Sequence, residues 1–107
     1  MDMTSPIVPT EHEGALPIRV AALYHFTSFA DCTTLRAQLL EACRKLGIRG
    51  ILLLAHEGIN GTIAGTDSAI ADILAVIRAL PGCADLEVKS SRAPALPFHR
   101  MKVRIKR

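Results

Sequence analysis

The segment from residue 56 to residue 61, His-Glu-Gly-Ile-Asn-Gly, contains the side chains of this sequence that are best suited to chemistry. His56 could transfer a proton near neutral pH, because imidazole titrates there. Glu57 could orient that imidazole, and the amide of Asn60 could donate a hydrogen bond to a substrate oxygen. The neighbouring glycines would let a substrate backbone or a phosphate approach closely. His56, Glu57 and Asn60 are therefore candidate substrate-facing or interdomain residues.

The same segment also has a purely structural interpretation. Glycine supplies the positive φ of a tight turn, Asn60 can bond to the turn backbone, and His56 and Glu57 can pair or face solvent. A third interpretation is a docking surface for a neighbouring domain, or one wall of the cleft between the two. We predict no metal site, because His56 and Glu57 are adjacent and point to opposite sides of a strand.

The second chemical feature is a basic segment at the end of the sequence. Residues 1–88 contain six Lys or Arg and ten Asp or Glu, a formal charge of −4. Residues 89–107 contain seven Lys or Arg and no acid, a formal charge of +7. A basic segment on an acidic body indicates an anionic partner, nucleic acid above all. The candidate phosphate contacts are Arg100, Lys102, Arg104 and Lys106.

Strict alternation predicts that residues 101–107 form a strand. The inward positions are Met101, Val103 and Ile105, and the outward positions are Lys102, Arg104 and Lys106. Alternate side chains of a strand lie about 6–7 Å apart, so this row could hold a phosphate backbone. The alternative is an edge strand that its cations keep soluble and unpaired. The predicted sheet lacks the paired exposed aromatic side chains of an RRM, so we expect no base stacking.

Composition limits the remaining possibilities. A chain of 107 residues, 50% hydrophobic and 21% charged, is expected to form one globular domain. No apolar run approaches the roughly 18–20 residues of a membrane span, and no signal peptide is recognisable. We therefore expect a cytoplasmic location and no membrane partner. The three cysteines form no CxxC pair, which disfavours a disulfide or zinc site. Cys43 should lie in the core, whereas Cys32 and Cys83, near helix ends, could be exposed.

The elements that would position these residues are short and well separated. Residues 1–17 are predicted to be a disordered leader, because they contain three prolines and no periodicity, and residues 18–107 to be the folded domain. The predicted strands are residues 19–26, 51–55, 59–64, 85–90 and 101–107. The predicted helices are residues 31–46, capped by Asp31, and a helix from Thr66 or Asp67 to about residue 79. Residues 91–97, with two prolines, are predicted to be a loop.

This order, β-α-β-β-α-β with one further strand, is the split βαβ pattern of ferredoxin-like, acylphosphatase-like α+β folds. Right-handed crossovers then place both helices on one face of an antiparallel sheet. The strand at 51–55 is apolar on both sides, so both of its faces should be buried, one of them by something that need not belong to this chain. His25, among apolar neighbours, is expected to be a hydrogen-bonded histidine within the sheet.

Three segments together resemble one known family. They are VAALYHFTSF at 20–29, LAHEGINGTIAG at 54–65 and PFHRMKVRIKR at 97–107. These segments are similar to the N-terminal domain of the rhodanese-domain tRNA uridine(34) hydroxylases, formerly an uncharacterised rhodanese-like family. The string AHEGINGT is long and unusual, which makes the resemblance specific.

The resemblance implies a parent enzyme that hydroxylates uridine at the wobble position of tRNA, forming 5-hydroxyuridine in an oxygen-dependent reaction. It implies two partners, tRNA and a downstream rhodanese domain of the same polypeptide. The catalytic cysteine of the family lies in that rhodanese domain. None of the cysteines in this sequence occupies a rhodanese active-site loop, so we assign no catalytic residue and no cofactor to this chain.

Three functional hypotheses follow from the sequence. The first is the tRNA-positioning domain of such an enzyme, and the second is a structural or docking module for a rhodanese domain with no direct RNA contact. The third is a small hydrolase similar to acylphosphatase, which needs a glycine-rich, arginine-containing phosphate loop after the first strand. Residues 27–30, Thr-Ser-Phe-Ala, contain neither glycine nor arginine, so the third hypothesis is disfavoured.

Overall fold

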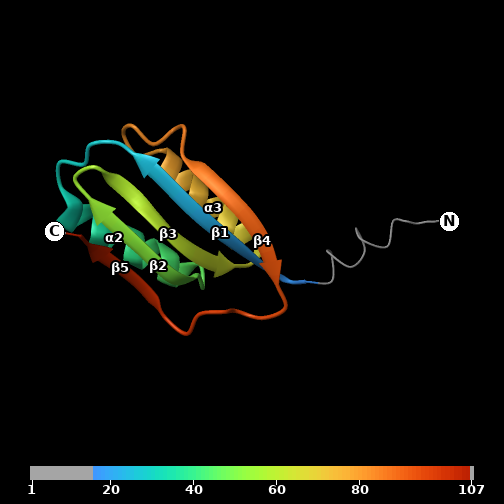
Figure 1. The fold of residues 1–107 in the computed structure, drawn as a ribbon. Coiled ribbons are helices and arrows are strands. Elements are labelled where there is room, and N and C mark those ends of the chain that lie inside the picture. Colours follow the sequence, from blue (N-terminus) through green and yellow to red (C-terminus); the bar gives the residue numbers. More distant parts are fainter. Residues whose placement is uncertain (1–15, 107) are drawn as a thin grey trace.

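Two helices lie side by side on one face of a β-sheet in the computed structural model, which describes residues 16–106 (Figure 1). Over these residues the elements are β1 (Ile18–Phe26), α2 (Cys32–Lys45), β2 (Arg49–Ala55), β3 (Gly58–Gly65), α3 (Asp67–Arg78), β4 (Glu87–Ala93) and β5 (Met101–Ile105). This confirms the predicted ferredoxin-like α+β arrangement. The predicted leader lies outside the described residues except for its last two positions.

The strand order in the sheet is β4-β1-β3-β2-β5. The four strands of the split βαβ pattern pair antiparallel, as expected. The fifth strand differs, because β5 pairs parallel with β2 in the register that sets Gly50 opposite Met101 and Leu54 opposite Ile105. Residues 94–100 carry the chain from the β4 edge to the opposite edge, where it enters beside β2 in the same direction (Figure 1). The sheet is therefore mixed at this one edge.

Both helices begin and end as their sequences predict. The carboxylate of Asp31 accepts a hydrogen bond from the Thr34 amide at 3.0 Å, and the hydroxyl of Thr66 accepts one from the Ala69 amide at 3.2 Å. Side-chain caps of this kind satisfy backbone N–H groups that lack a partner within the helix. The inward stripes are Leu35, Leu39 and Cys43 on α2, and Ile70, Ile73 and Ile77 on α3. These stripes pack on the apolar side of the sheet and form the core.

Helices cover one face of the sheet and not the other. Leu52 and Leu54 point toward the helices and are fully buried, whereas Ile51 and Leu53 point to the other face and are half-buried. No element among residues 16–106 packs over that second face (Figure 1). We call it the open face. We expected both faces of β2 to be buried. Within the described chain, only the face toward the helices is fully buried.

Several strand boundaries differ from the predicted ones. β2 begins at Arg49, two residues earlier than predicted, and β4 begins at Glu87, two residues later. The predicted loop at 91–97 begins only at residue 94, because Ser91 pairs with Val20 and Ala93 with Ile18 at the β4 edge. The last strand ends at Ile105, two residues before the predicted end. Position 107 lies outside the described residues.

The cysteines and His25 are structural. Cys43 has no exposed surface, as expected, and burial raises the pKa of its thiol to about 11. The expectation that Cys32 and Cys83 could be exposed was wrong, because both are buried. Cys83 lies in a tight turn whose backbone bonds to Leu80 and Leu86, and this turn carries its side chain under the sheet. A ring nitrogen of His25 bonds to the Gly82 carbonyl, which confirms a satisfied histidine.

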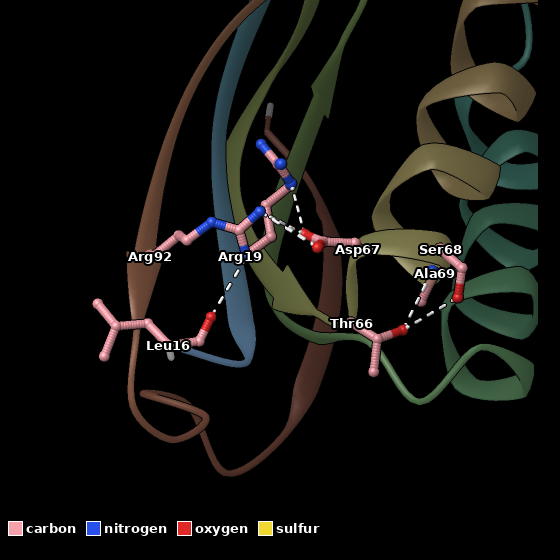
Figure 2. A network of polar contacts seen from close by, with 7 residues as sticks. All are labelled: Leu16, Arg19, Thr66, Asp67, Ser68, Ala69 and Arg92. Carbon is pink, nitrogen blue, oxygen red and sulfur yellow. Dashed lines mark hydrogen bonds and ion pairs between the residues drawn. The ribbon is translucent and has the colours of Figure 1, made fainter. Parts of the chain in front are cut away.

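A charged network ties β1, β4 and α3 together (Figure 2). Asp67, the first residue of α3, accepts hydrogen bonds from Arg19 at 2.9 Å and from Arg92 at 3.1 Å. Arg92 also donates to the Leu16 carbonyl at 3.3 Å. These hydrogen bonds hold the pKa of the Asp67 carboxyl below its ordinary value of 3.8. The bond from Arg92 has the larger effect and the bond from Arg19 the smaller.

The Asp67 network predicts an acid-dependent contribution to stability. Because the folded-state pKa is below the unfolded-state value, the contribution is complete above the unfolded pKa and is lost as pH falls through the folded pKa. We expect Asp67→Asn to be less stable than the wild type near pH 6, and the difference to be smaller at pH 3, in urea unfolding. The control is Asp72→Asn, an exposed change on the same helix. A constant difference between wild type and Asp67→Asn at both pH values would contradict the prediction.

Glycine at position 61 is required by close strand packing. Gly61 has φ of +153°, and a Cβ added there would collide with the Ile51 carbonyl oxygen of β2. We predict that Gly61→Ala lowers the free energy of unfolding by about 2–4 kcal/mol. Gly65→Ala in the same strand is the control, because the nearest atom to its Cβ would belong to the flexible Ile48 side chain at 3.2 Å, and the Ala69 Cβ and Ile48 Cα would lie at ordinary contact distances of 3.6 and 3.8 Å. Equal losses in urea unfolding would show that strand spacing does not depend on Gly61.

Candidate nucleic-acid interface

The basic residues predicted near the end of the chain lie together at one edge of the open face. Lys102 and Arg104 are exposed, and they alternate with Met101 and Val103, which are buried under the helices. Lys106 follows the strand and is also exposed. The predicted alternation is therefore confirmed. Arg100 precedes the strand, is exposed, and accepts a hydrogen bond from the Gly50 amide through its carbonyl at 2.8 Å.

Contacts from both sides hold this edge strand in place. The Lys106 amide donates to the Leu54 carbonyl at 2.7 Å, which extends the pairing with β2 by one bond. The guanidinium of Arg36, on α2, donates to the Val103 carbonyl at 2.6 Å. An edge strand has one row of backbone groups without a strand partner, and Arg36 satisfies one of them. The backbone that carries the cations of β5 is therefore held in place by hydrogen bonds on both sides.

The register places these cations in rows with residues of the central strands. Arg104 lies opposite Leu53, Leu53 opposite Asn60, and Asn60 opposite Tyr24. Residues opposite one another in a sheet share a face. The open face therefore runs from cations on β5, over half-buried aliphatic side chains on β2, to an amide and an aromatic ring. Two exposed cations not singled out from the sequence, Arg49 and Lys89, share this face.

The structure separates the three candidate residues of the 56–60 segment. His56 and Glu57 form the two-residue turn between β2 and β3, and their carbonyls accept the amides of Phe29 and Thr27 at 3.1 and 3.0 Å. The His56 Nδ1 also lies 3.2 Å from the Phe29 carbonyl oxygen, so the imidazole is turned toward the β1–α2 loop. Asn60 instead lies within β3 on the open face. His56 and Asn60 therefore do not converge on one substrate.

Two exposed aromatic side chains flank Asn60, and the sequence-based expectation that they were lacking was wrong. Tyr24 is 46% exposed and Phe26 72% exposed, and their rings meet edge to face with centroids 5.1 Å apart. Because side chains alternate along a strand, both lie on one face of β1. Their exposure could not be predicted, because it depends on which face the helices cover.

A hollow of about 250 Å³ lies at this end of the open face. Both aromatic rings line it together with Asn60, Glu57 and Lys106. On the other side of the rings, Asp85 and Glu87 line a separate depression. The aromatic pair therefore lies between the hollow that contains Lys106 and the depression that contains Asp85 and Glu87.

The loop after β1 is engaged in backbone bonding. In residues 27–30, the amides of Thr27 and Phe29 donate to the β2–β3 turn. Those two amides are unavailable to an anion, and the loop contains neither glycine nor arginine. Both facts disfavour the acylphosphatase-like hydrolase hypothesis.

Within residues 16–106, no three His, Cys, Asp or Glu side chains are grouped so that they could hold a metal ion. In the same part of the chain, every helix is too short or too polar to cross a membrane.

With the fold and this surface described, the chain can be compared with solved structures. It is similar to the BLUF protein BlrB in its dark state, with a TM-score of 0.67 and 23% identity over 85% of this chain and 74% of that chain. It is also similar to acylphosphatase from Bacillus subtilis, with a TM-score of 0.62 and 12% identity over 80% of this chain and 97% of that chain. At these identities, the likeness concerns the fold alone.

Comparison with sequences is more specific. A Gluconobacter oxydans protein named tRNA uridine(34) hydroxylase is 69% identical over 91 residues, which are 85% of this chain and 29% of that protein. A Caulobacter vibrioides protein of the same name is 60% identical over 89 residues, 83% of this chain and 28% of that protein. The chain therefore spans less than a third of these curated relatives. Residues 18–107 match the family described as UPF0176 acylphosphatase like domain, and the chain belongs to that family.

Proposed function

We propose that this chain is the tRNA-positioning domain of an enzyme that hydroxylates uridine 34 of tRNA. The name of the relatives supports the reaction. The chain spans only a small share of their length, which supports a separate domain for the catalytic step. In this proposal the oxygen-dependent step that forms 5-hydroxyuridine belongs to a downstream rhodanese domain. The proposal includes a cytoplasmic location, where tRNA is modified.

The observation that carries the proposal is the row of cations fixed on β5. Lys102, Arg104 and Lys106 are exposed on or beside a strand whose backbone is bonded to β2 and to Arg36. Their spacing of about 6–7 Å is close to that of successive phosphates along a nucleic-acid strand. Binding through such contacts releases counterions, so it weakens steeply with salt and carries little sequence information. These contacts therefore position a tRNA without selecting its bases.

A second candidate function is favoured by the centre of the same face. Ile51 and Leu53 are half-buried there, and Tyr24 and Phe26 are exposed beside them. An apolar area of this kind is typical of a protein-docking surface. The alternative is therefore a docking module for the rhodanese domain with no direct RNA contact, in which Glu57 and Asn60 face the neighbouring domain.

The proposal predicts that tRNA binding depends on the β5 cations. We expect the triple variant Lys102→Gln, Arg104→Gln and Lys106→Gln to bind tRNA more weakly, because three phosphate contacts are lost. The slope of log affinity against log salt should become shallower by about 2–3, measured by fluorescence anisotropy. The control is Lys45→Gln on α2, which removes an exposed cation of the helical layer and should change the salt slope by less than the triple variant does.

Two results would contradict this proposal. One is no binding of tRNA at low salt, and the other is an unchanged affinity and salt slope in the triple variant. The docking alternative is tested by adding a rhodanese domain of the family in trans and recording amide chemical shifts. Shifts around residues 55–62, together with no tRNA binding, would establish the docking module instead.

A further inference from the structure

The hollow at the end of the open face has properties that phosphate binding leaves unexplained. Its lining includes two aromatic rings, an amide, a carboxylate and an ammonium group, together with His25, Ala55, Gly58 and Ile59. Its size is below the roughly 300–1,000 Å³ of pockets that enclose drug-sized ligands. A single flat ring system is the kind of group that such a site accommodates.

The aromatic rings can offer a stacking surface. Phe26 meets Tyr24 edge to face, and most of its own surface remains in contact with solvent. Stacking of a nucleobase on an exposed aromatic ring stabilises binding for any base, because every base has a π-face. Single exposed apolar side chains are common on proteins, so the groups that surround these two rings decide what the hollow can bind.

The polar groups around the rings match the edge of a base and its phosphate. The amide of Asn60 makes no hydrogen bond to another residue among those described and can both donate and accept. Glu57 adds an acceptor, and Lys106 adds a cation that continues the row of Lys102 and Arg104. Base edges contain donors and acceptors that pair with such groups.

Most charges around the hollow favour one orientation of a bound strand, and the two exceptions are Glu57 in its lining and Lys89 on β4. Cations lie on the β5 side, whereas Asp85 and Glu87 lie beyond the aromatic rings. A phosphate backbone is attracted to the first side and repelled from the second. A base attached to that backbone would therefore extend from β5 toward Tyr24 and Phe26.

We propose that this hollow binds one unpaired nucleobase of an RNA, stacked against the Tyr24–Phe26 pair, while the β5 cations hold the adjoining backbone. The inference rests on the proposed function and adds that the bound segment is single-stranded. Bases within a duplex are stacked on one another and cannot enter such a site, whereas bases of loops can be splayed out. Charge favours RNA over a protein segment, because Lys106 lines the hollow and Lys102 and Arg104 continue its row of cations along β5.

A direct test uses Tyr24 as its reporter. The sequence contains one tyrosine and no tryptophan, so the intrinsic fluorescence of the chain comes from Tyr24. The probes are an unstructured heptamer RNA, an abasic oligomer of the same length, and a duplex of the heptamer, with free tyrosine amide correcting for absorbance. We expect the heptamer to quench Tyr24 and to bind more tightly than the abasic oligomer and the duplex.

Variants of the rings give a second readout. We expect Phe26→Leu to bind the heptamer about 5- to 20-fold more weakly and to leave affinity for the abasic oligomer unchanged. Phe26→Tyr, which keeps the ring, should retain affinity. The matched control is Val76→Ala, an exposed apolar residue on α3.

The outcomes separate this inference from the proposed function. Equal binding of heptamer, duplex and abasic oligomer, with loss in the β5 triple variant, would overturn the nucleobase site and leave the positioning function standing. Binding of no oligomer and no tRNA would overturn both. Full heptamer affinity in Phe26→Leu, with loss of the shifts caused by an added rhodanese domain, would overturn the nucleobase site in favour of a protein partner.

Discussion

The parallel pairing of β5 with β2 is the interaction on which the candidate surface depends. Its register sets Arg104 opposite Leu53 and so in line with Asn60 and Tyr24. Because side chains alternate along a strand, a slip of one residue would turn the cations of β5 toward the helices. The bond from Arg36 to the Val103 carbonyl and the burial of Met101 and Val103 both favour the observed register.

The second determinant is the one-sided cover of the sheet. Both helices pack on the same face, as right-handed crossovers require, so the opposite face keeps its side chains accessible within the described chain. That face combines an aliphatic centre, an aromatic pair, cations at one edge and acids near the other. The arrangement is suited to a partner with a charged backbone and apolar rings, and unpaired RNA has both.

Much of the fold could be predicted from local pattern. The cap at Asp31 and the alternation of Met101 to Ile105 are determined by neighbouring residues, and the structure confirms them. The parallel addition of β5, the burial of Cys83 and the exposure of Phe26 depend on contacts distant in sequence. His56 and Asn60 are close in sequence, yet a turn bonded to the β1–α2 loop separates their side chains. Local sequence pattern therefore predicted local structure better than it predicted which side chains lie together.

In the proposed function, RNA binds to the open face and not to the helical layer. The most direct measurement is a ¹H–¹⁵N NMR titration of the chain with an unmodified anticodon stem-loop RNA at low salt. We expect shift changes to concentrate on β5, on Asn60 and on the end of β1 near Tyr24. Shift changes that concentrate on α2 and α3, or none at saturating RNA, would contradict it.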